Sequence, residues 1–82
     1  MRYTLEFVDK ALDRLRALPK GQRRLIGEKI DRLQDDLSGD VKKLRGFKNK
    51  YRLRVGMYRV LFELEKACIV VYDVEDRKDV YE

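Results

Sequence analysis

Residues 51–59 read YRLRVGMYR and bring together three arginines, Arg52, Arg54 and Arg59, with no acidic residue between them. Arginine stays positively charged at physiological pH, and its planar guanidinium group binds a phosphate through two parallel hydrogen bonds. A surface strand usually mixes the two signs of charge, because like charges that lie close together repel each other. The segment therefore predicts a surface that binds phosphate groups.

The charge of the whole chain is concentrated in the same region. The 82 residues include 20 lysines and arginines and 15 acidic residues, which gives a net charge of +5. Residues 42–59 contain eight of the basic residues and none of the acidic ones, so the remainder of the chain is mildly acidic. This separation is typical of a face that binds a polyanion, although a solvated basic loop would explain residues 42–50 equally well. Besides the three arginines, the basic residues here are Lys42, Lys43, Arg45, Lys48 and Lys50.

A tight turn within this segment explains how the arginines come to share one face. The sequence VGMY at 55–58 fits a two-residue hairpin in which Gly56 takes the first central position of a type II′ turn. This register places Arg54 directly opposite Arg59, and Arg52 lies on the same face because side chains alternate across a strand. The other face is apolar and should pack on the core; it carries Leu53, Val55, Tyr58, Val60, Phe62 and Leu64.

The opposed pair of Arg54 and Arg59 destabilises a hairpin unless something compensates for the repulsion. Both side chains could extend into water, where dissolved salt screens the repulsion. A bound anion is the stronger interpretation, because a third arginine and a basic loop share this face.

The rest of the chain supplies the elements that position this hairpin. Residues 2–7 alternate apolar and polar side chains, which predicts a half-buried strand. Asp9 is expected to cap a first helix, which Pro19 and Gly21 end. A second helix should end at the SGD sequence of residues 38–40. The apolar stripes are Leu12, Leu15 and Leu18 on the first helix, and Ile26, Ile30, Leu33 and Leu37 on the second.

The second half of the chain is predicted to form most of a sheet. Residues 41–50 are interpreted as a basic loop or the start of a strand, and strands are expected at about 51–55, 58–64 and 68–74. The order β-α-α-β-β-β predicts an α+β fold in which two N-terminal helices pack on a mainly antiparallel sheet. The length suits one domain, which we place at residues 1–82.

The composition favours a soluble cytoplasmic domain without a metal or other cofactor. Cys68 is the only cysteine, so no disulfide can form within the chain and a reducing compartment is expected. We expect no signal peptide and no membrane contact, because the longest apolar run is too short to span a bilayer. The chain has no histidine, and Asp35, Asp36 and Asp40 are interpreted as helix surface and cap, so no metal site is predicted.

The C-terminal sequence DRKDVY, residues 76–81, adds two more basic residues and an aromatic hydroxyl. Arg77 and Lys78 extend the positive charge, and Tyr81 lies one residue from the end. Tyr81 either packs against the sheet or stacks on a nucleobase, as aromatic side chains do when proteins bind single-stranded RNA. The residues alone leave both interpretations open.

Taken together, these motifs resemble a known family. The sequences KLRG at 43–46, YRLRVGMYRVLFEL at 51–64 and DRKDVY at 76–81, behind two helices, resemble the RelE/ParE superfamily of bacterial and archaeal toxins. The closing RKDVY is similar to the RelE branch. The resemblance implies a RelE-like fold and a toxin that enters the ribosomal A site and cleaves mRNA there, stopping translation.

The resemblance also implies a mechanism and the residues that carry it; without a His or Cys cluster, this mechanism is expected to be independent of a metal. A ribose 2′-hydroxyl attacks the adjacent phosphate, which leaves a 2′,3′-cyclic phosphate and a 5′-hydroxyl. The family's catalytic positions match Arg52, Arg54, Arg59, Arg77 and Tyr81. Contacts to mRNA and ribosomal RNA would come from Lys42, Lys43, Arg45, Lys48, Lys50 and Lys78. Many relatives carry a histidine where this chain has Asp76, so the general base stays open among Tyr81, Glu75, Asp76, Asp79 and a group on the ribosome.

The family analogy further predicts the partners and the rival functions. An antitoxin encoded by the adjacent gene should wrap the domain and block the basic face, and DNA would be met only through the toxin–antitoxin complex. A ParE-like gyrase poison is the closest alternative, because it uses the same fold without nuclease chemistry. The other alternative is a catalytically weakened homologue that binds RNA or DNA through its arginines alone.

Overall fold

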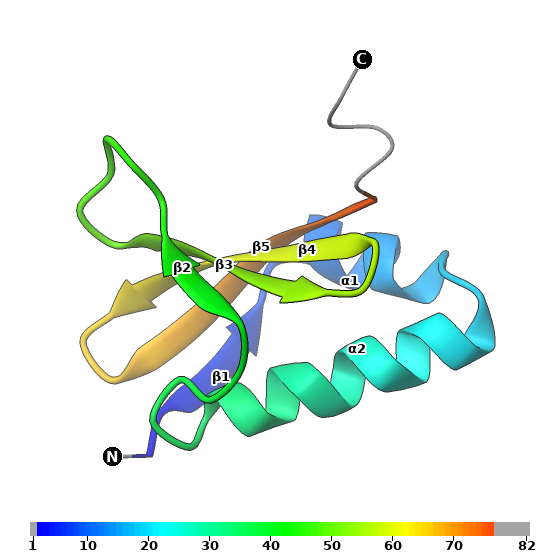
Figure 1. Cartoon of the computed structure of the whole chain (residues 1–82), viewed down its shortest axis with the longest axis horizontal. Coiled ribbons are helices and arrows are strands. Elements are labelled where there is room, and N and C mark those ends of the chain that lie inside the picture. Colours follow the sequence, from blue (N-terminus) through cyan, green and yellow to red (C-terminus); the bar gives the residue numbers. More distant parts are fainter. Residues whose placement is uncertain (1, 77–82) are drawn as a thin grey trace.

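The computed structural model describes residues 2–76, which contain two helices and five strands (Figure 1). The strands form one sheet in the order β1-β5-β4-β3-β2, in which β1 runs parallel to β5 and all other pairs are antiparallel. The elements are β1 (Thr4–Phe7), α1 (Asp9–Arg16), α2 (Lys20–Leu33), β2 (Val41–Lys43), β3 (Lys50–Val55), β4 (Tyr58–Glu65) and β5 (Cys68–Asp76). The predicted α+β class, with two helices on a mainly antiparallel sheet, is confirmed.

The segment 41–50 contributes a short strand as well as a loop. Residues Val41–Lys43 form β2, which pairs with β3 and places Lys42 opposite Arg52. This strand extends the sheet beyond the hairpin and brings the first lysines of the basic segment beside the arginines.

The predicted hairpin register is confirmed. Val55 pairs with Tyr58, Arg54 with Arg59 and Leu53 with Val60. Gly56 has a φ of 58°, whereas Met57 has a negative φ, as a type II′ turn requires. The apolar face packs against Ala11 of α1 and against Ile26, Ile30 and Leu33 of α2, so both helices cover the same face of the sheet.

The start of α1 differs from the prediction. Asp9 is already part of the helix, and Val8 precedes it as an N-cap residue that makes no side-chain hydrogen bond. Asp9 therefore does not cap the helix, but its charge in the first turn still interacts favourably with the helix dipole. On this helix the completely buried residue is Ala11, while Leu12 is only half-buried.

The end of α2 comes earlier than predicted. The helix stops at Leu33, and Asp36 and Leu37 both adopt left-handed backbone with φ of 57°. The N–H of Leu37 donates to the carbonyl of Leu33 over 2.9 Å, so Leu37 packs against the core from a turn outside the helix. The chain has therefore left the helix before Gly39, and the SGD sequence does not end it.

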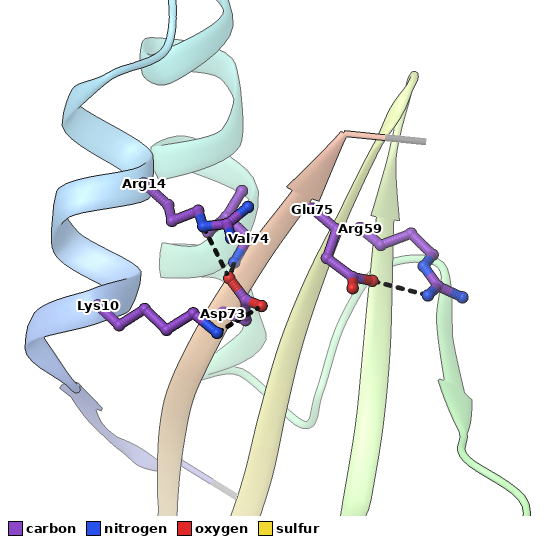
Figure 2. Close-up of polar contacts among 6 residues, drawn as sticks. All are labelled: Lys10, Arg14, Arg59, Asp73, Val74 and Glu75. Atoms are coloured by element: carbon purple, nitrogen blue, oxygen red, sulfur yellow. Dashed lines mark hydrogen bonds and ion pairs between the residues drawn. The ribbon is translucent and has the colours of Figure 1, made fainter. Parts of the chain in front are cut away.

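A buried carboxylate joins α1 to β5. Asp73 is only 9% exposed, and its carboxylate lies 3.4 Å from Lys10 Nζ and 3.6 Å from Arg14 Nε (Figure 2). Asp73 Oδ1 also accepts a hydrogen bond of 2.8 Å from the N–H of Val74. Two cations and a backbone N–H compensate for its burial, so this contact fixes the helix against the strand.

Two glycines should respond in opposite directions to substitution by alanine. Gly39 has a φ of 129°, and a Cβ there would lie 2.9 Å from Leu53 Cδ1. Gly39→Ala should therefore lower the free energy of unfolding by at least about 1 kcal/mol. Gly27 lies within α2 with nothing within 4 Å of a Cβ, so Gly27→Ala should raise it by up to about 1 kcal/mol. Urea midpoints measure both changes, and an unchanged midpoint for Gly39→Ala would contradict the positive φ and close contact described for Gly39.

Candidate nucleic-acid interface

An open groove of about 390 Å³ lies on the face of the sheet that the helices leave uncovered. The three arginines of the hairpin reach this face because they alternate with core residues along β3 and β4. Six of the seven residues that line the groove are basic, and none is acidic. They are Lys42, Lys43, Leu44, Arg45, Arg52, Arg54 and Arg59.

Arg52 is held by Asp40, an acidic residue that lies outside the segment 51–59. Its Nη1 donates to the backbone carbonyl of Asp40 over 2.8 Å and lies 3.1 Å from the carboxylate Oδ1 of the same residue. The side chain is only 15% exposed. Arg52 therefore fixes the turn before β2, and its remaining hydrogen-bonding capacity faces the groove.

Arg59 also has an acidic partner, which local sequence did not reveal. Glu75 pairs with Arg59 in the register of β4 and β5, and its Oε1 accepts a hydrogen bond of 2.7 Å from Arg59 Nη2 (Figure 2). Arg59 Nε is buried and has no hydrogen-bond partner among residues 2–76. Glu75 thus offsets the repulsion between Arg59 and Arg54 across the hairpin, so an acidic residue of a neighbouring strand supplies compensation that the sequence analysis attributed to a bound anion.

Arg54 is the most available of the three arginines. Its side chain is exposed and makes no hydrogen bond or ion pair within the described residues. Its backbone N–H donates to the carbonyl of Asp40 over 3.0 Å, which ties the strand to the same turn that holds Arg52. A rigid backbone with a free guanidinium group is well suited to bind an anion.

Two of the predicted basic residues lie outside the groove. Lys48 is exposed on the loop between β2 and β3. Lys50 is half-buried, with its Nζ 3.8 Å from Glu63 Oε1, 4.7 Å from the ring centre of Phe47 and 5.2 Å from that of Tyr72. Lys50 therefore belongs to a separate cluster on the same face.

Tyr72 is a titratable residue of this face that sequence analysis missed. Burial raises the pKa of its phenol, and the negative charges of Glu63, Glu75 and Asp73 raise it further, while Arg59 acts in the opposite direction. The phenol is therefore neutral at physiological pH and cannot serve as a base. Its place in the valine-rich run of residues 68–72 suggested only a core strand.

The C-terminal site residues Arg77, Lys78 and Tyr81, with Asp79, lie outside the described residues. Within residues 2–76, no three His, Cys, Asp or Glu side chains gather closely enough to hold a metal ion. No helix in that part of the chain is both long and apolar enough to cross a membrane.

A sheet with two helices on one face and a groove of basic side chains on the other defines a small α+β domain of RelE-like fold. The chain belongs to the family of ParE toxins of the type II toxin–antitoxin system parDE, whose family model matches residues 5–81. The relatives place it in the RelE branch of that superfamily, as the motifs predicted.

A curated relative and several solved structures carry this assignment. Toxin RelE3 of Methanocaldococcus jannaschii is 42% identical over 48 residues, which are 58% of this chain and 54% of the relative. The chain thus spans about half the length of that relative. The RelB–RelE antitoxin–toxin complex from Methanococcus jannaschii contains a chain that is 31% identical, with a TM-score of 0.79 over 93% of this chain and 94% of that one.

A second archaeal structure agrees with the first. In the RelE–RelB complex from Pyrococcus horikoshii, the matching chain is 28% identical, with a TM-score of 0.77 over 94% of this chain and 97% of that one. The similarity covers nearly the whole of both chains, so the overall fold is shared with these relatives.

The raised pKa of Tyr72 predicts a pH dependence of stability. Below about pH 10 the phenol is protonated in both states and contributes no difference. As the pH rises above that value, the unfolded chain loses the proton first, so the native state loses stability until its own higher pKa is reached. Tyr72→Phe should therefore lose less stability than the wild type as the pH is raised from about 9 to values above about 10, measured as urea midpoints. Equal losses in the two proteins would contradict the raised pKa.

Proposed function

We propose that this chain is the toxin of a type II toxin–antitoxin system and a ribosome-dependent mRNA endoribonuclease. The observation that carries the proposal is the groove with six basic and no acidic lining residues on the open face of a RelE-branch fold. Such a groove attracts a phosphodiester backbone and can stabilise the negative charge that builds up on the phosphate. By analogy with the RelB–RelE complexes, the partner in the cytoplasm is an antitoxin, and we expect it to cover this face.

The proposed reaction needs no metal ion. The 2′-oxygen of a ribose attacks the adjacent phosphorus, and the bond to the 5′-oxygen of the next nucleotide breaks. A base accepts the proton of the 2′-hydroxyl, and an acid supplies one to the departing 5′-oxygen. Arg54, Arg59 and Arg77 bind the non-bridging oxygens and stabilise their charge. Arg52, which is fixed by Asp40, orients the backbone on the 5′ or 3′ side of the scissile bond.

We further propose Glu75 as the general base. A carboxylate can accept the proton at neutral pH, whereas the neutral phenol of Tyr72 cannot. Among residues 2–76, Glu75 is the carboxylate that contacts Arg59, through its Oε1, and its side chain is 28% exposed. Tyr81 would then orient or stack on a base, and one of the arginines or a ribosomal group would assist the leaving oxygen.

A ParE-like gyrase poison remains the second candidate. The family model that matches the chain is described as the ParE toxin of the type II toxin–antitoxin system parDE, whereas the similar proteins carry the name RelE. That function needs the basic face to bind a protein or DNA and requires no base at Glu75. The two candidates therefore differ in what the cell loses, which is translation in one case and control of DNA supercoiling in the other.

Arg54→Ala should reduce mRNA cleavage by about 10²–10³-fold, because one donor to the phosphate is lost. The fold should be unaffected, since the Arg54 side chain has no partner among the described residues. Ribosomes programmed with mRNA and an open A site provide the assay, and primer extension locates the cut. Arg32→Ala on α2 is the matched control, because it removes the same charge from an exposed position away from the groove.

Two results would contradict the nuclease proposal. Intact mRNA on these ribosomes with the wild-type protein would exclude cleavage. Normal protein synthesis together with supercoiling defects in cells that express the chain would instead establish the gyrase-poison function. A cleaved product that ends in a 2′,3′-cyclic phosphate supports the proposed reaction.

Glu75→Gln tests the base. The amide oxygen can still accept a hydrogen bond from Arg59, so the position of the arginine is preserved while the basicity is lost. Cleavage should fall by about 10²–10⁴-fold, and RNA binding should stay the same or become tighter because a negative charge is removed. Glu63→Gln is the control, because it removes a carboxylate that pairs with Lys50 on the same face. If Glu75→Gln cleaves as fast as the control, Glu75 only positions Arg59.

A further inference from the structure

Phe47 is an aromatic side chain that stays half exposed in the middle of the basic segment. Its exposed fraction is 50%, whereas the aromatic side chains of Tyr51 and Phe62 stack on each other against the core. Phe47 lies on the loop between β2 and β3, directly after Gly46, whose φ of 87° turns the chain. A single exposed apolar residue is common on protein surfaces, so the role of this one depends on what surrounds it.

Hydrogen bonds fix both ends of the loop that carries Phe47. The N–H of Leu44 donates to the carbonyl of Lys50 over 2.8 Å. Asn49 and Leu64 are joined twice, through Leu64 N–H to the Asn49 carbonyl over 2.9 Å and through Asn49 Nδ2 to the Leu64 carbonyl over 3.3 Å. The ring is therefore presented by a loop that is anchored to the sheet on both sides.

A cation covers one side of the Phe47 ring. Lys50 Nζ lies 4.7 Å from the ring centre, a favourable cation–π distance, and the same Nζ is shared with Tyr72 and Glu63. These contacts hold Lys50 in place beside the ring, and half of the Phe47 surface remains exposed to solvent. A flat apolar surface next to a positive charge can receive the face of a nucleobase whose phosphate the charge attracts.

The ring also lies at the end of a line of positive charges. Lys50, Arg52 and Arg54 occupy alternate positions of β3 and so share one face, spaced about 7 Å apart along the strand. Leu44 and Arg45, from the same loop as Phe47, line the groove. A single strand that follows these charges with its backbone would bring its bases towards the loop.

We propose that Phe47 is a stacking platform for a base of single-stranded RNA whose backbone lies in the groove. Single strands are bound in this way, by a cationic groove along the backbone and by aromatic rings under the bases. The inference depends on the proposed function only for the class of ligand, and it requires no cleavage. It therefore stands or falls on binding alone.

The absence of tryptophan from the chain allows a direct test. Phe47→Trp introduces a single indole, and a 2′-O-methyl oligoribonucleotide serves as a ligand that cannot supply the attacking hydroxyl. Stacking of a base should quench the indole fluorescence as the oligonucleotide is added. An oligonucleotide of the same length with abasic sites should bind without quenching. Leu25→Trp, an exposed position on α2, is the matched control and should not be quenched.

Affinities measured by fluorescence anisotropy separate stacking from charge. Phe47→Ala should weaken binding about 5- to 150-fold, Phe47→Tyr should bind like the wild type, and Phe47→Leu should bind as weakly as Phe47→Ala. The salt dependence of binding should not change in Phe47→Ala, because no charge is lost. In Arg54→Ala the slope of log affinity against log salt should become shallower by about 0.7.

Three outcomes would overturn the inference. Phe47→Trp that binds the oligonucleotide without quenching would exclude stacking, and Phe47→Leu with wild-type affinity would mean that apolar packing suffices. An indole signal in Phe47→Trp that responds to the antitoxin and not to RNA would make Phe47 part of a protein interface. Should Phe47→Ala fail to fold, Phe47→Leu takes its place in the comparison. Quenching by RNA without cleavage on ribosomes would leave the inference standing and refute the nuclease proposal instead.

Discussion

The register between β3 and β4 is the constraint on which both the core and the basic face depend. Side chains alternate along a strand, so a slip of one residue would bury the arginines and expose the residues that now pack on the helices. Gly56 fixes this register because only a residue that tolerates positive φ fits the first central position of the turn. The burial of Leu53 and Phe62 on one face and the position of Arg54 on the other therefore have a single cause.

The repulsion among the basic side chains of this face is reduced because acidic residues pair with some of them and leave the others unpaired. Asp40 contacts Arg52, Glu63 contacts Lys50 and Glu75 contacts Arg59, each from outside the groove lining. Within residues 2–76, the two exposed arginines and the two exposed lysines of the groove lack such partners; they are Arg45, Arg54, Lys42 and Lys43. These acids hold their basic partners in place and lower the repulsion, while the potential in the groove stays positive. A bound phosphate would thus meet side chains that are already positioned, which reduces the ordering that binding requires.

Short-range patterns explain what the sequence could predict. The alternation around Gly56 and the spacing of Ile26, Ile30 and Leu33 identify the hairpin and the second helix, because both depend on neighbouring residues. The helix end was misplaced because Asp36 and Leu37 adopt left-handed backbone, although neither is glycine. The partner of Arg59 was missed because Glu75 lies on another strand, and which residue of β5 faces Arg59 depends on a pairing that no local pattern specifies.

A register shift between β4 and β5 shows why that pairing could not be inferred. Phe62 pairs with Val71 and Leu61 with Asp73, so Tyr72 is an extra residue in β5. The shift allows Val71 and Val74, three positions apart, both to be buried, although regular alternation would place them on opposite faces. It occurs just beyond Val71, where the pairing with β1 ends, and there Asp73 reaches the two cations of α1. The same shift sets the phase of the strand beyond it, so that Glu75 faces Arg59. The extra residue Tyr72 therefore affects two features at once: the contact of Asp73 with α1 and the position of the Glu75 carboxylate beside the groove.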